Sequence, residues 1–457
     1  MSKEILINLL VANSPYMSSP GAWTLPTDTT AGHGTLAFWT NLARIAERGM
    51  LDCIFLADTF GVFDVYKSGA EIAIRHGVRI PAHDPILVIP AMAQVTKNVC
   101  FAVTQNTSVE NPYLLARRLA TLDHLLDGRL AWNIVTGFQE SGAKAVGLKQ
   151  VADPAKRYAM LDEYMEVVYK LLESGWDPGA VVRDKVSGIY SDPEKVHKVS
   201  HNGVHFQMEG YHLVEPSRQR VPVLFQAGAS GPGRAFAARN AECIFMIDSS
   251  HKVLAQQTAA IRQEARQVGR DAMDIKAFAG YTVIVGRTDK EAQEKYQSYF
   301  ENANLEAALT FASGSIGVDL SKFDPNQPIP QEVNNAQVRS IIDTYSGNSA
   351  SGKVWTPREI ALHMAVGGRS ARVVGSAEKV ADHLIKTVAE TDIDGFALSS
   401  GSTPADYIDF VDLVVPILQE RGAFKHNYQE GTFRKKLFGA DSLSSRHPGF
   451  GYRRTGP

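Results

Sequence analysis

Short apolar runs rich in β-branched residues alternate along this chain with longer amphipathic segments, and this alternation constrains the fold most strongly. Eight such runs occur, at residues 5–11, 53–56, 99–104, 130–135, 221–226, 243–247, 275–285 and 395–398. A repeated strand–helix order is typical of a parallel α/β architecture with helices covering the sheet. Eight units match a closed (β/α)8 barrel, the TIM barrel, better than an open doubly wound sheet, although the pattern alone leaves both possible.

The segments between these runs have the apolar spacing of helices. They lie at 36–49, 112–126, 159–172, 233–240, 251–268, 289–302 and 405–421. Two stretches interrupt the alternation, about 173–220 after the fourth strand and about 311–372 after the seventh, and both are interpreted as insertions. At these places they would either wall a pocket or decorate the surface. We expect a single elaborated barrel domain, 1–457, with a C-terminal tail at 429–457 that wraps the surface or a partner subunit.

Composition excludes several classes of protein. The chain has 47 Lys and Arg against 49 Asp and Glu, so it has no strong positive charge with which to bind nucleic acid or an anionic membrane. The apolar run at 5–11 is too short for a signal sequence or a membrane span. Cys53, Cys100 and Cys243 are widely spaced in apolar runs, which indicates neither a disulfide framework nor a zinc site. We therefore expect a cytoplasmic protein.

Polar residues end or interrupt several of the predicted strands. Asp58 follows CIFLA, Thr104 and Asn106 follow CFAV, and Asn133 and Thr136 lie in AWNIVTG. In a barrel, polar groups at the carboxyl ends of strands face the ligand crevice. A single residue of this kind is more often a helix cap, but recurrence on three strands favours a binding site.

A possible phosphate site lies in QAGASGPGRAFAARNAE, which follows a predicted strand and begins a helix. Its glycines and Ser230 could present backbone N–H groups and a hydroxyl to an anion at the helix N-terminus. The segment lacks the GK[ST] of a P-loop and the glycine spacing of a dinucleotide site. A tight turn that requires glycine is the alternative interpretation.

The sequence contains no HExxH or CxxC metal motif and no GxSxG nucleophile elbow. Arg75, His76 and Arg79, in IAIRHGVRIPAHDP, form a cationic group at which an anionic part of a substrate could dock. A solvated surface is the alternative for this group.

Long collinear segments of the chain resemble the FMN-dependent, luciferase-like monooxygenases, the group that includes nitrilotriacetate, dibenzothiophene sulfone, dimethyl sulfide and long-chain alkane monooxygenases. The resemblance covers essentially the whole chain. Its most specific segments are FLADTFGVFDVY, NPYLLARRLATLDHLLDGRLAWNIVTG, KRYAMLDEYMEVVYKL, DKVSGIYSDPEKVHKVSHNGVHF, EPSRQRVPVLFQAGASGPGRAFAARNAE and VVPILQERGAFKHNYQEGTFRKKLFG. It implies a TIM barrel of the bacterial-luciferase-like type.

The resemblance also implies a cofactor and a reaction. A separate NAD(P)H:flavin reductase would supply reduced FMN, and a flavin hydroperoxide formed with O2 would oxygenate an alkane, organosulfur compound or amine. The positions that match the FMN site of the family are Asp58, Thr104, Asn106, Val135, Thr136, Tyr158 and Ser230. Tyr158 and Ser230 would bind the phosphate, and the strand-end residues would contact the isoalloxazine ring. The family further implies a homodimer or homotetramer.

The substrate pocket departs from the pattern of the long-chain alkane enzymes. Positions that carry Cys, His, Tyr, Gln and His near the reacting flavin in those enzymes are here Ser14, Met17, Phe63, Arg79 and Phe138. The loss of both imidazoles removes obvious groups for proton transfer. Arg79, with Phe63 and Phe138, would instead suit a substrate that is partly apolar and partly anionic.

Two other functions fit the same residues. The chain could bind flavin without oxygenating a substrate, as a carrier or accessory subunit, and the missing histidines motivate this alternative. It could also be a TIM-barrel oxidoreductase that uses a deazaflavin, a cofactor of related barrels.

Overall fold

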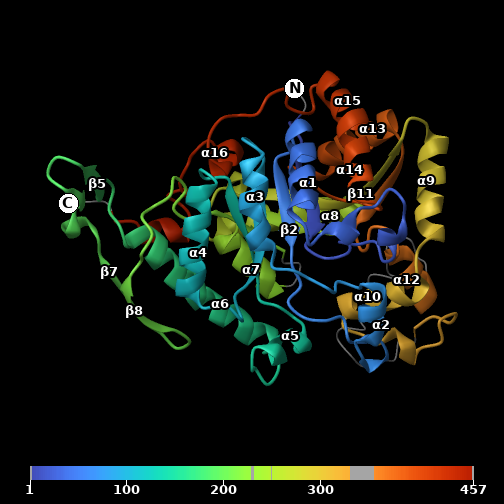
Figure 1. Cartoon of the computed structure of the whole chain (residues 1–457), viewed down its shortest axis with the longest axis horizontal. Coiled ribbons are helices and arrows are strands. Elements are labelled where there is room, and N and C mark those ends of the chain that lie inside the picture. Colours follow the sequence, from blue (N-terminus) through green and yellow to red (C-terminus); the bar gives the residue numbers. More distant parts are fainter. Residues whose placement is uncertain (1–2, 228–230, 249, 330–354, 455–457) are drawn as a thin grey trace.

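The computed structural model describes residues 3–227, 231–248, 250–329 and 355–454. Its main sheet is parallel, with the strand order β10-β9-β4-β3-β2-β1-β13-β11-β12, and an additional pairing of β10 with β11 closes eight strands into a barrel. The barrel strands are β1 (Leu6–Ala12), β2 (Cys53–Ala57), β3 (Cys100–Asn106), β4 (Leu130–Val135), β9 (Val223–Gln226), β10 (Cys243–Met246), β11 (Lys276–Gly286) and β13 (Gly395–Ser399). The eight predicted runs form these strands, and the predicted TIM barrel is confirmed (Figure 1).

A ninth strand, β12 (Ala371–Ser376), lies outside the barrel. It pairs with the second half of β11, from Tyr281 opposite Ala371 to Gly286 opposite Ser376. The first half of β11 pairs with β10 and β13 inside the closed sheet. The sequence did not predict β12, because it begins at the end of the irregular stretch 311–372.

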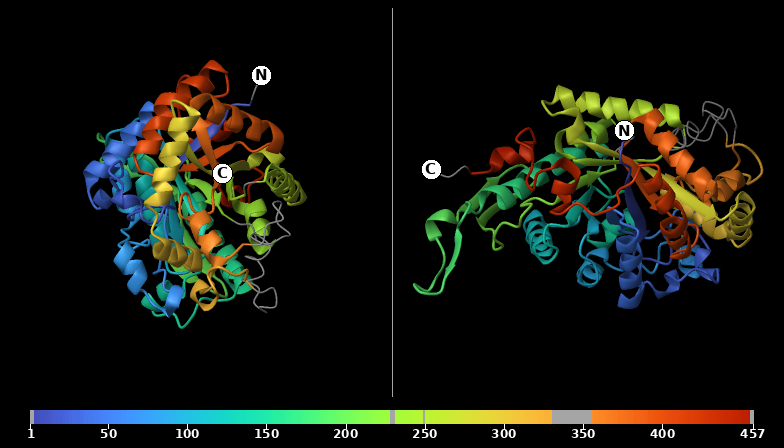
Figure 2. Two further views of the ribbon diagram at one scale, coloured as in Figure 1. Left: turned by 90° about the vertical axis from the view of Figure 1, so that its right-hand side faces the viewer. Right: turned by 90° about the horizontal axis from the view of Figure 1, so that it is seen from above.

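Helices cover the outside of the barrel (Figures 1 and 2). Those that correspond to predicted helical segments are α1 (Leu36–Arg48), α4 (Pro112–Leu125), α6 (Pro154–Tyr169), α7 (Gly231–Asn240), α8 (His251–Gln267), α9 (Asp289–Glu301), α14 (Ala405–Asp409) and α15 (Val415–Glu420). The further helices are α2 (Glu71–His76), α3 (Ile89–Gln94), α5 (Glu140–Ala145), α10 (Leu305–Ile316), α12 (Pro357–Met364), α13 (Ala377–Thr391) and α16 (Phe433–Phe438). Two π-helical turns, Lys170–Ser174 and Phe410–Val414, extend α6 and join α14 to α15.

Local signals fix where the helices near the strand ends begin. The Asn111 side chain accepts hydrogen bonds from the N–H groups of Tyr113 and Leu114, and Pro112 is the first residue of α4. Asp153 caps α6 in the same way, with Pro154 following it. A side-chain cap followed by proline sets a sharp helix start. The α6 cap therefore determines the position of Arg157 and Tyr158, one turn later.

The core has two layers. The barrel interior holds a buried cluster that includes Phe55, Phe225 and Phe278 together with Cys53, Cys100 and Cys243, whose thiols are free and buried. Between the strands and the helices lies a larger cluster, which includes Trp39 and Trp132, both fully buried. Continuous apolar strands, buried on both faces, are expected of a parallel barrel.

The C-terminal tail closes the amino-terminal end of the barrel. Helix α16 places Phe433 and Leu437 in the interior cluster, and the Phe433 ring stacks on Phe225 with centroids 6.2 Å apart. Arg434 is buried and donates to both carboxylate oxygens of Glu242, at 2.7 and 2.8 Å. The tail therefore completes the core of its own chain.

Residues 173–220 form an arm that projects from the body, seen at the left of the right-hand view in Figure 2. It consists of two antiparallel hairpins, β5 (Val181–Asp184) with β6 (Ile189–Ser191) and β7 (Lys198–Asn202) with β8 (Gln207–Tyr211). Because this segment follows α6 and precedes β9, it begins beyond the helix and not at the carboxyl end of a strand. None of the residues that line the two cavities described below belongs to the arm.

Candidate active site

A cavity of about 390 Å³ lies at the carboxyl ends of the barrel strands, a volume within the usual range of small-molecule sites. Its wall consists of strand-end residues, the start of α6, and one residue that precedes β12. The lining residues are Asp58, Thr59, Phe60, Thr104, Asn106, Ile134, Val135, Thr136, Gly137, Phe138, Gln139, Arg157, Tyr158, Leu161, Gln226, Ala227 and Arg369. We call this the main cavity.

The main cavity brings together most of the residues predicted for the flavin. Asp58, Thr104, Asn106, Val135, Thr136 and Tyr158 all line it. The remaining predicted residue, Ser230, lies outside the described residues, although Ala227 at the end of β9 lines the same cavity. Residues separated by up to a hundred positions in the sequence are thus gathered on one wall.

Hydrogen bonds join the ends of β3 and β4 and fix the polar groups there. Asn106 accepts from the N–H of Ser108 at 3.0 Å, and the Ser108 hydroxyl donates to the carbonyl of Thr136 at 2.7 Å. Gly137 has φ of 65°, and a Cβ at this position would lie 2.4 Å from Nδ2 of Asn106. Glycine is therefore required for the turn to pass so close to the asparagine.

Several buried polar atoms of the lining residues have no partner in the described part of the protein. They are Nε of Arg157, Oε1 of Gln226 and Oε1 of Gln139. Buried polar groups without partners are costly, so a polar ligand is expected to satisfy them. The mixture of a donor and two acceptors suits an isoalloxazine ring, which carries both kinds of group. The residues present therefore fit a flavin.

Two guanidinium groups line the main cavity. Arg157 donates to the Thr136 hydroxyl at 3.2 Å and to the carbonyl of Gly137, and Arg369 lines the same cavity. The Tyr158 hydroxyl accepts from Nε2 of Gln226 at 3.4 Å, and its ring packs on Phe236 of α7. Guanidinium groups and a hydroxyl in one cavity could bind a phosphate.

Asp58 is the carboxylate of the main cavity, and Arg79 lies behind it. Burial raises the pKa of Asp58, while the N–H of Thr59 and the charge of Arg79 act in the opposite direction. Arg79 donates to the Thr59 hydroxyl at 2.7 Å and to the carbonyl of Met17 at 3.2 Å. Because its side chain is buried and Thr59 lines the cavity, Arg79 acts on the cavity through its neighbours.

The four residues proposed for the substrate are placed differently from one another. Phe138 lines the main cavity and is 58% exposed. Ser14 is buried and its hydroxyl donates to the carbonyl of Tyr16, while Phe63 stacks on Phe311 of α10 with centroids 5.7 Å apart. Ser14, Phe63 and Arg79 are not among the residues that line the two cavities described here.

The predicted cationic group does not form one surface. Arg75 is exposed on α2, His76 lies 3.8 Å from the Glu306 carboxylate, and Arg79 is buried. The reason is that α2 ends at His76, after which the left-handed Gly77 turns the chain inward. Arg75 and Arg79 therefore cannot bind the same anionic group.

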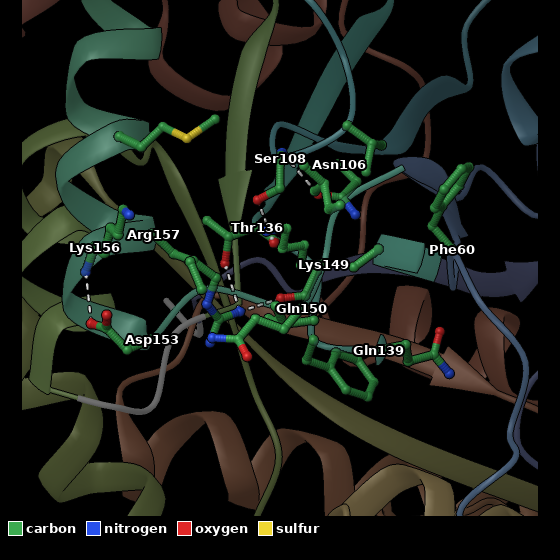
Figure 3. A pocket seen from close by; sticks show the side chains of 18 residues that line it. Phe60, Asn106, Ser108, Thr136, Gln139, Lys149, Gln150, Asp153, Lys156 and Arg157 are labelled. Carbon is green, nitrogen blue, oxygen red and sulfur yellow. Dashed lines mark hydrogen bonds between the residues drawn. The ribbon is translucent and has the colours of Figure 1, made fainter. Parts of the chain in front are cut away.

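A second cavity of about 360 Å³ adjoins the main cavity and is shown in Figure 3. The two share the strand-end residues, and the second extends between α5 and the start of α6. We call this the side chamber; it is lined by Phe60, Asn106, Ser108, Val109, Thr136, Gly137, Phe138, Gln139, Ala143, Leu148, Lys149, Gln150, Val151, Ala152, Asp153, Lys156, Arg157 and Met160. No histidine is among the residues that line either cavity.

Several polar residues that line the main cavity were missed from the sequence, among them Gln226, Arg157 and Arg369. Gln226 ends β9 and could have been found by the same strand-end argument as Asp58. Arg157 precedes Tyr158 and carries no signal of its own. Arg369 follows two glycines in the left-handed region, Gly367 and Gly368, and only the tertiary structure brings it to a wall formed by residues 58–227.

Barrel, cavity and lining residues together fit a flavin-binding enzyme, and comparison with known proteins makes it a flavin-dependent monooxygenase. Residues 12–395 match the model of the luciferase-like monooxygenases, and the chain belongs to that family. Members of this family use reduced FMN. In the described part of the chain, no helix is both long and apolar enough to cross a membrane.

The similarity to individual proteins extends over almost the whole chain. The dimethyl-sulfide monooxygenase of Hyphomicrobium sulfonivorans is 43% identical over 99% of this chain and 94% of its own. The long-chain alkane monooxygenase of Geobacillus thermodenitrificans is 43% identical over 96% and 95%. A crystal structure of a riboflavin lyase with modified FMN and riboflavin is 37% identical, with a TM-score of 0.90 over 99% of this chain and 100% of the other.

Proposed function

We propose that this protein is the oxygenase component of a two-component system, which adds one atom of O2 to a small organosulfur or alkane substrate at the expense of reduced FMN. The observation that carries the proposal is the main cavity, which gathers Asp58, Thr104, Asn106, Thr136 and Tyr158 beside unpartnered polar atoms. The substrate classes rest on the names of the two relatives that are 43% identical.

The residues have separate tasks in this proposal. Reduced FMN, when bound, supplies the electrons for O2 activation, and the protein holds it and excludes water. Asp58, Thr104, Asn106, Val135 and Thr136 orient the ring. Tyr158 and Ser230 bind the phosphate, and the guanidinium groups of Arg157 and Arg369 add positive charge to the cavity.

The proposal includes partners and location. A separate NAD(P)H:flavin reductase delivers the reduced flavin by diffusion or transient contact. A further relative, 32% identical over 91% of this chain, is by its name component A of nitrilotriacetate monooxygenase, which supports an enzyme of more than one component. We also propose a homodimer or homotetramer in the cytoplasm; the buried, free cysteines suit a reducing compartment.

The decisive experiment mixes the protein with photoreduced FMN without oxygen and then admits O2, with and without an organic sulfide. A protected site delays the return of oxidised-flavin absorbance and yields an oxygenated sulfide. Immediate return with one H2O2 per flavin, and no product from any sulfide, sulfone, amine or alkane, would instead indicate a flavin carrier. Tight binding of a deazaflavin without affinity for FMN would indicate the third alternative.

A further inference from the structure

The side chamber combines apolar walls with an excess of positive charge. Lys149, Lys156 and Arg157 line it, and Asp153 is the one carboxylate among its lining residues. The Asp153 carboxylate is already engaged in capping α6, where it accepts from the N–H of Lys156 at 3.0 Å. In the described part of the chain, no carboxylate lies within ion-pair distance of the Lys149 or Lys156 ammonium group.

The apolar part of the chamber is open to solvent. Phe60, Phe138 and Leu148 are 43%, 58% and 43% exposed, and all three line the chamber. Large apolar side chains gathered at one site are typical of a binding surface. In Figure 3, Lys156 and Arg157 lie on one side of the chamber and Phe60 lies on the other. A ligand that spans it would meet cations at one end and the Phe60 ring at the other.

The aromatic end leads to the reaction site. Phe60 and Phe138 line the main cavity as well as the side chamber, whereas Lys149 and Lys156 line the chamber alone. A molecule with its charged end at the lysines would therefore extend its apolar part towards the main cavity.

We propose that the side chamber selects substrates that have an apolar body and a terminal carboxylate or sulfonate, with the anion held by Lys149 and Lys156. This inference rests on the proposed function, because it names the substrate class of that same site. For a thioether acid, one atom of O2 is added to sulfur and the other leaves as water. The two electrons and two protons come from reduced FMN.

The test compares 6-(methylthio)hexanoate with its methyl ester, which has the same sulfide and no charge. The variants are Lys149→Gln/Lys156→Gln and, as a control, Lys144→Gln/Lys322→Gln, two exposed lysines that line neither cavity. We expect kcat/KM for the acid to exceed that for the ester by about tenfold at low salt, as expected for partly exposed charge-assisted contacts. The preference for the acid over the ester should decrease as salt is added. It should disappear in Lys149→Gln/Lys156→Gln and persist in Lys144→Gln/Lys322→Gln.

Other outcomes would overturn the inference. Equal kcat/KM for acid and ester in the unmodified protein would show that the chamber does not recognise the charge, and an equal loss of both substrates in Lys149→Gln/Lys156→Gln would show a structural effect. If Lys149→Gln/Lys156→Gln weakened the binding of FMN but not the binding of riboflavin, relative to the unmodified protein, the chamber would hold the flavin phosphate and not the substrate. If no sulfide, sulfone, amine or alkane is oxygenated, the proposed function fails; calorimetric binding of the acid to the flavin-free variants then still tests the chamber.

Discussion

Tyr158, at the start of α6, could bind the flavin phosphate through its hydroxyl or could serve only to pack the helix. Its ring packs on Phe236 and its hydroxyl accepts from Gln226, so Tyr158→Phe keeps the packing and removes one polar group. We expect the Kd of reduced FMN to rise about fivefold, the value of one hydrogen bond of ~1 kcal/mol. The Kd of reduced riboflavin, which has no phosphate, should stay within a factor of about two. Anaerobic fluorescence titration measures both.

Tyr113→Phe is the matched control for this variant. The Tyr113 hydroxyl donates to the carbonyl of Tyr211 in the arm, away from both cavities. An equal weakening of FMN and riboflavin by Tyr158→Phe would show that the hydroxyl contacts the ring or the protein and not the phosphate.

Arg79 affects the charge of Asp58 because Arg79 is buried, Asp58 is half-buried, and the guanidinium charge lowers the pKa of that carboxyl group. In Arg79→Ala the pKa of Asp58 should rise further. If FMN binding needs the ionised Asp58 carboxylate, the pH below which FMN affinity is lost should move upward in this variant. A series of FMN titrations from pH 5 to pH 8 would detect the change. Arg79→Lys should restore part of the shift. An unchanged pH dependence of FMN binding would show that Arg79 does not influence the ionisation of Asp58. Unchanged turnover of every accepted substrate would show that Arg79 does not bind an anionic group of the substrate.

The sequence predicts a site residue where a polar side chain stands at the carboxyl end of an apolar strand. Asp58, Thr104, Asn106 and Thr136 were found because a polar side chain at the end of an apolar run is unusual. Val135 and Tyr158 came from the family resemblance alone. Arg369 could not be found, because its position depends on a turn that packs against residues far away in the sequence.

Helix α16 acts as the plug at the amino-terminal end of the barrel. Phe433 is 1% exposed and stacks on Phe225, so Phe433→Ala would leave a cavity in the barrel interior. We expect a loss of about 3–5 kcal/mol in the free energy of unfolding, the usual range for a buried phenylalanine. Urea denaturation measures the loss, and Lys435→Ala, an exposed residue of the same helix, is the control. A loss below about 1 kcal/mol would show that the interior is stable without the plug.

The turn between β13 and α14 depends on one buried carboxylate. Asp406 accepts from the N–H groups of Gly401 and Ser402 and from the Tyr299 hydroxyl of α9. Burial raises the pKa of Asp406 to about 6 from its usual 3.8. The folded state therefore binds this proton more tightly, and its contribution to stability decreases as the pH rises from about 4 to about 6.

This linkage amounts to about 3 kcal/mol if the whole shift is expressed. In Asp406→Asn, the part of the pH dependence due to this residue should disappear, so that unfolding free energies at pH 5 and pH 7.5 differ less than in the unmodified protein. Asp382→Asn, an exposed residue paired with Arg421, is the control. An unchanged difference between the two pH values would contradict the raised pKa.

The strands that could be predicted from the sequence are those that are buried on both faces. The eight barrel strands are buried on both faces, so each is a continuous apolar run in the sequence. The strands of the arm are mostly exposed and contain Gly, Asp and His, so no periodicity distinguished them from loops. Closure of the barrel is a relation between β10 and β11 that no single segment encodes.

The arm makes the molecule as a whole elongated, and each of its two hairpin tips exposes a valine. Val186 and Val204 are 98% and 91% exposed, and a two-stranded hairpin is at best marginally stable without a further surface to pack on. A second copy of the chain would cover them. We expect light scattering to give two or four times 49.9 kDa, and Val186→Asp/Val204→Asp to shift the protein to a smaller species. A monomer at micromolar concentration before any substitution would contradict this prediction.

The enclosure of all three thiols inside the barrel has a consequence for the lifetime of the enzyme. Whenever O2 is reduced with no substrate to accept an oxygen atom, H2O2 is released beside the protein itself. Peroxide oxidises thiolates, and burial raises the pKa of Cys100 to about 12 and raises the pKa of Cys53 and Cys243 as well. The chain thus keeps its three thiols protonated and enclosed, so that peroxide released by wasteful turnover meets no thiolate there.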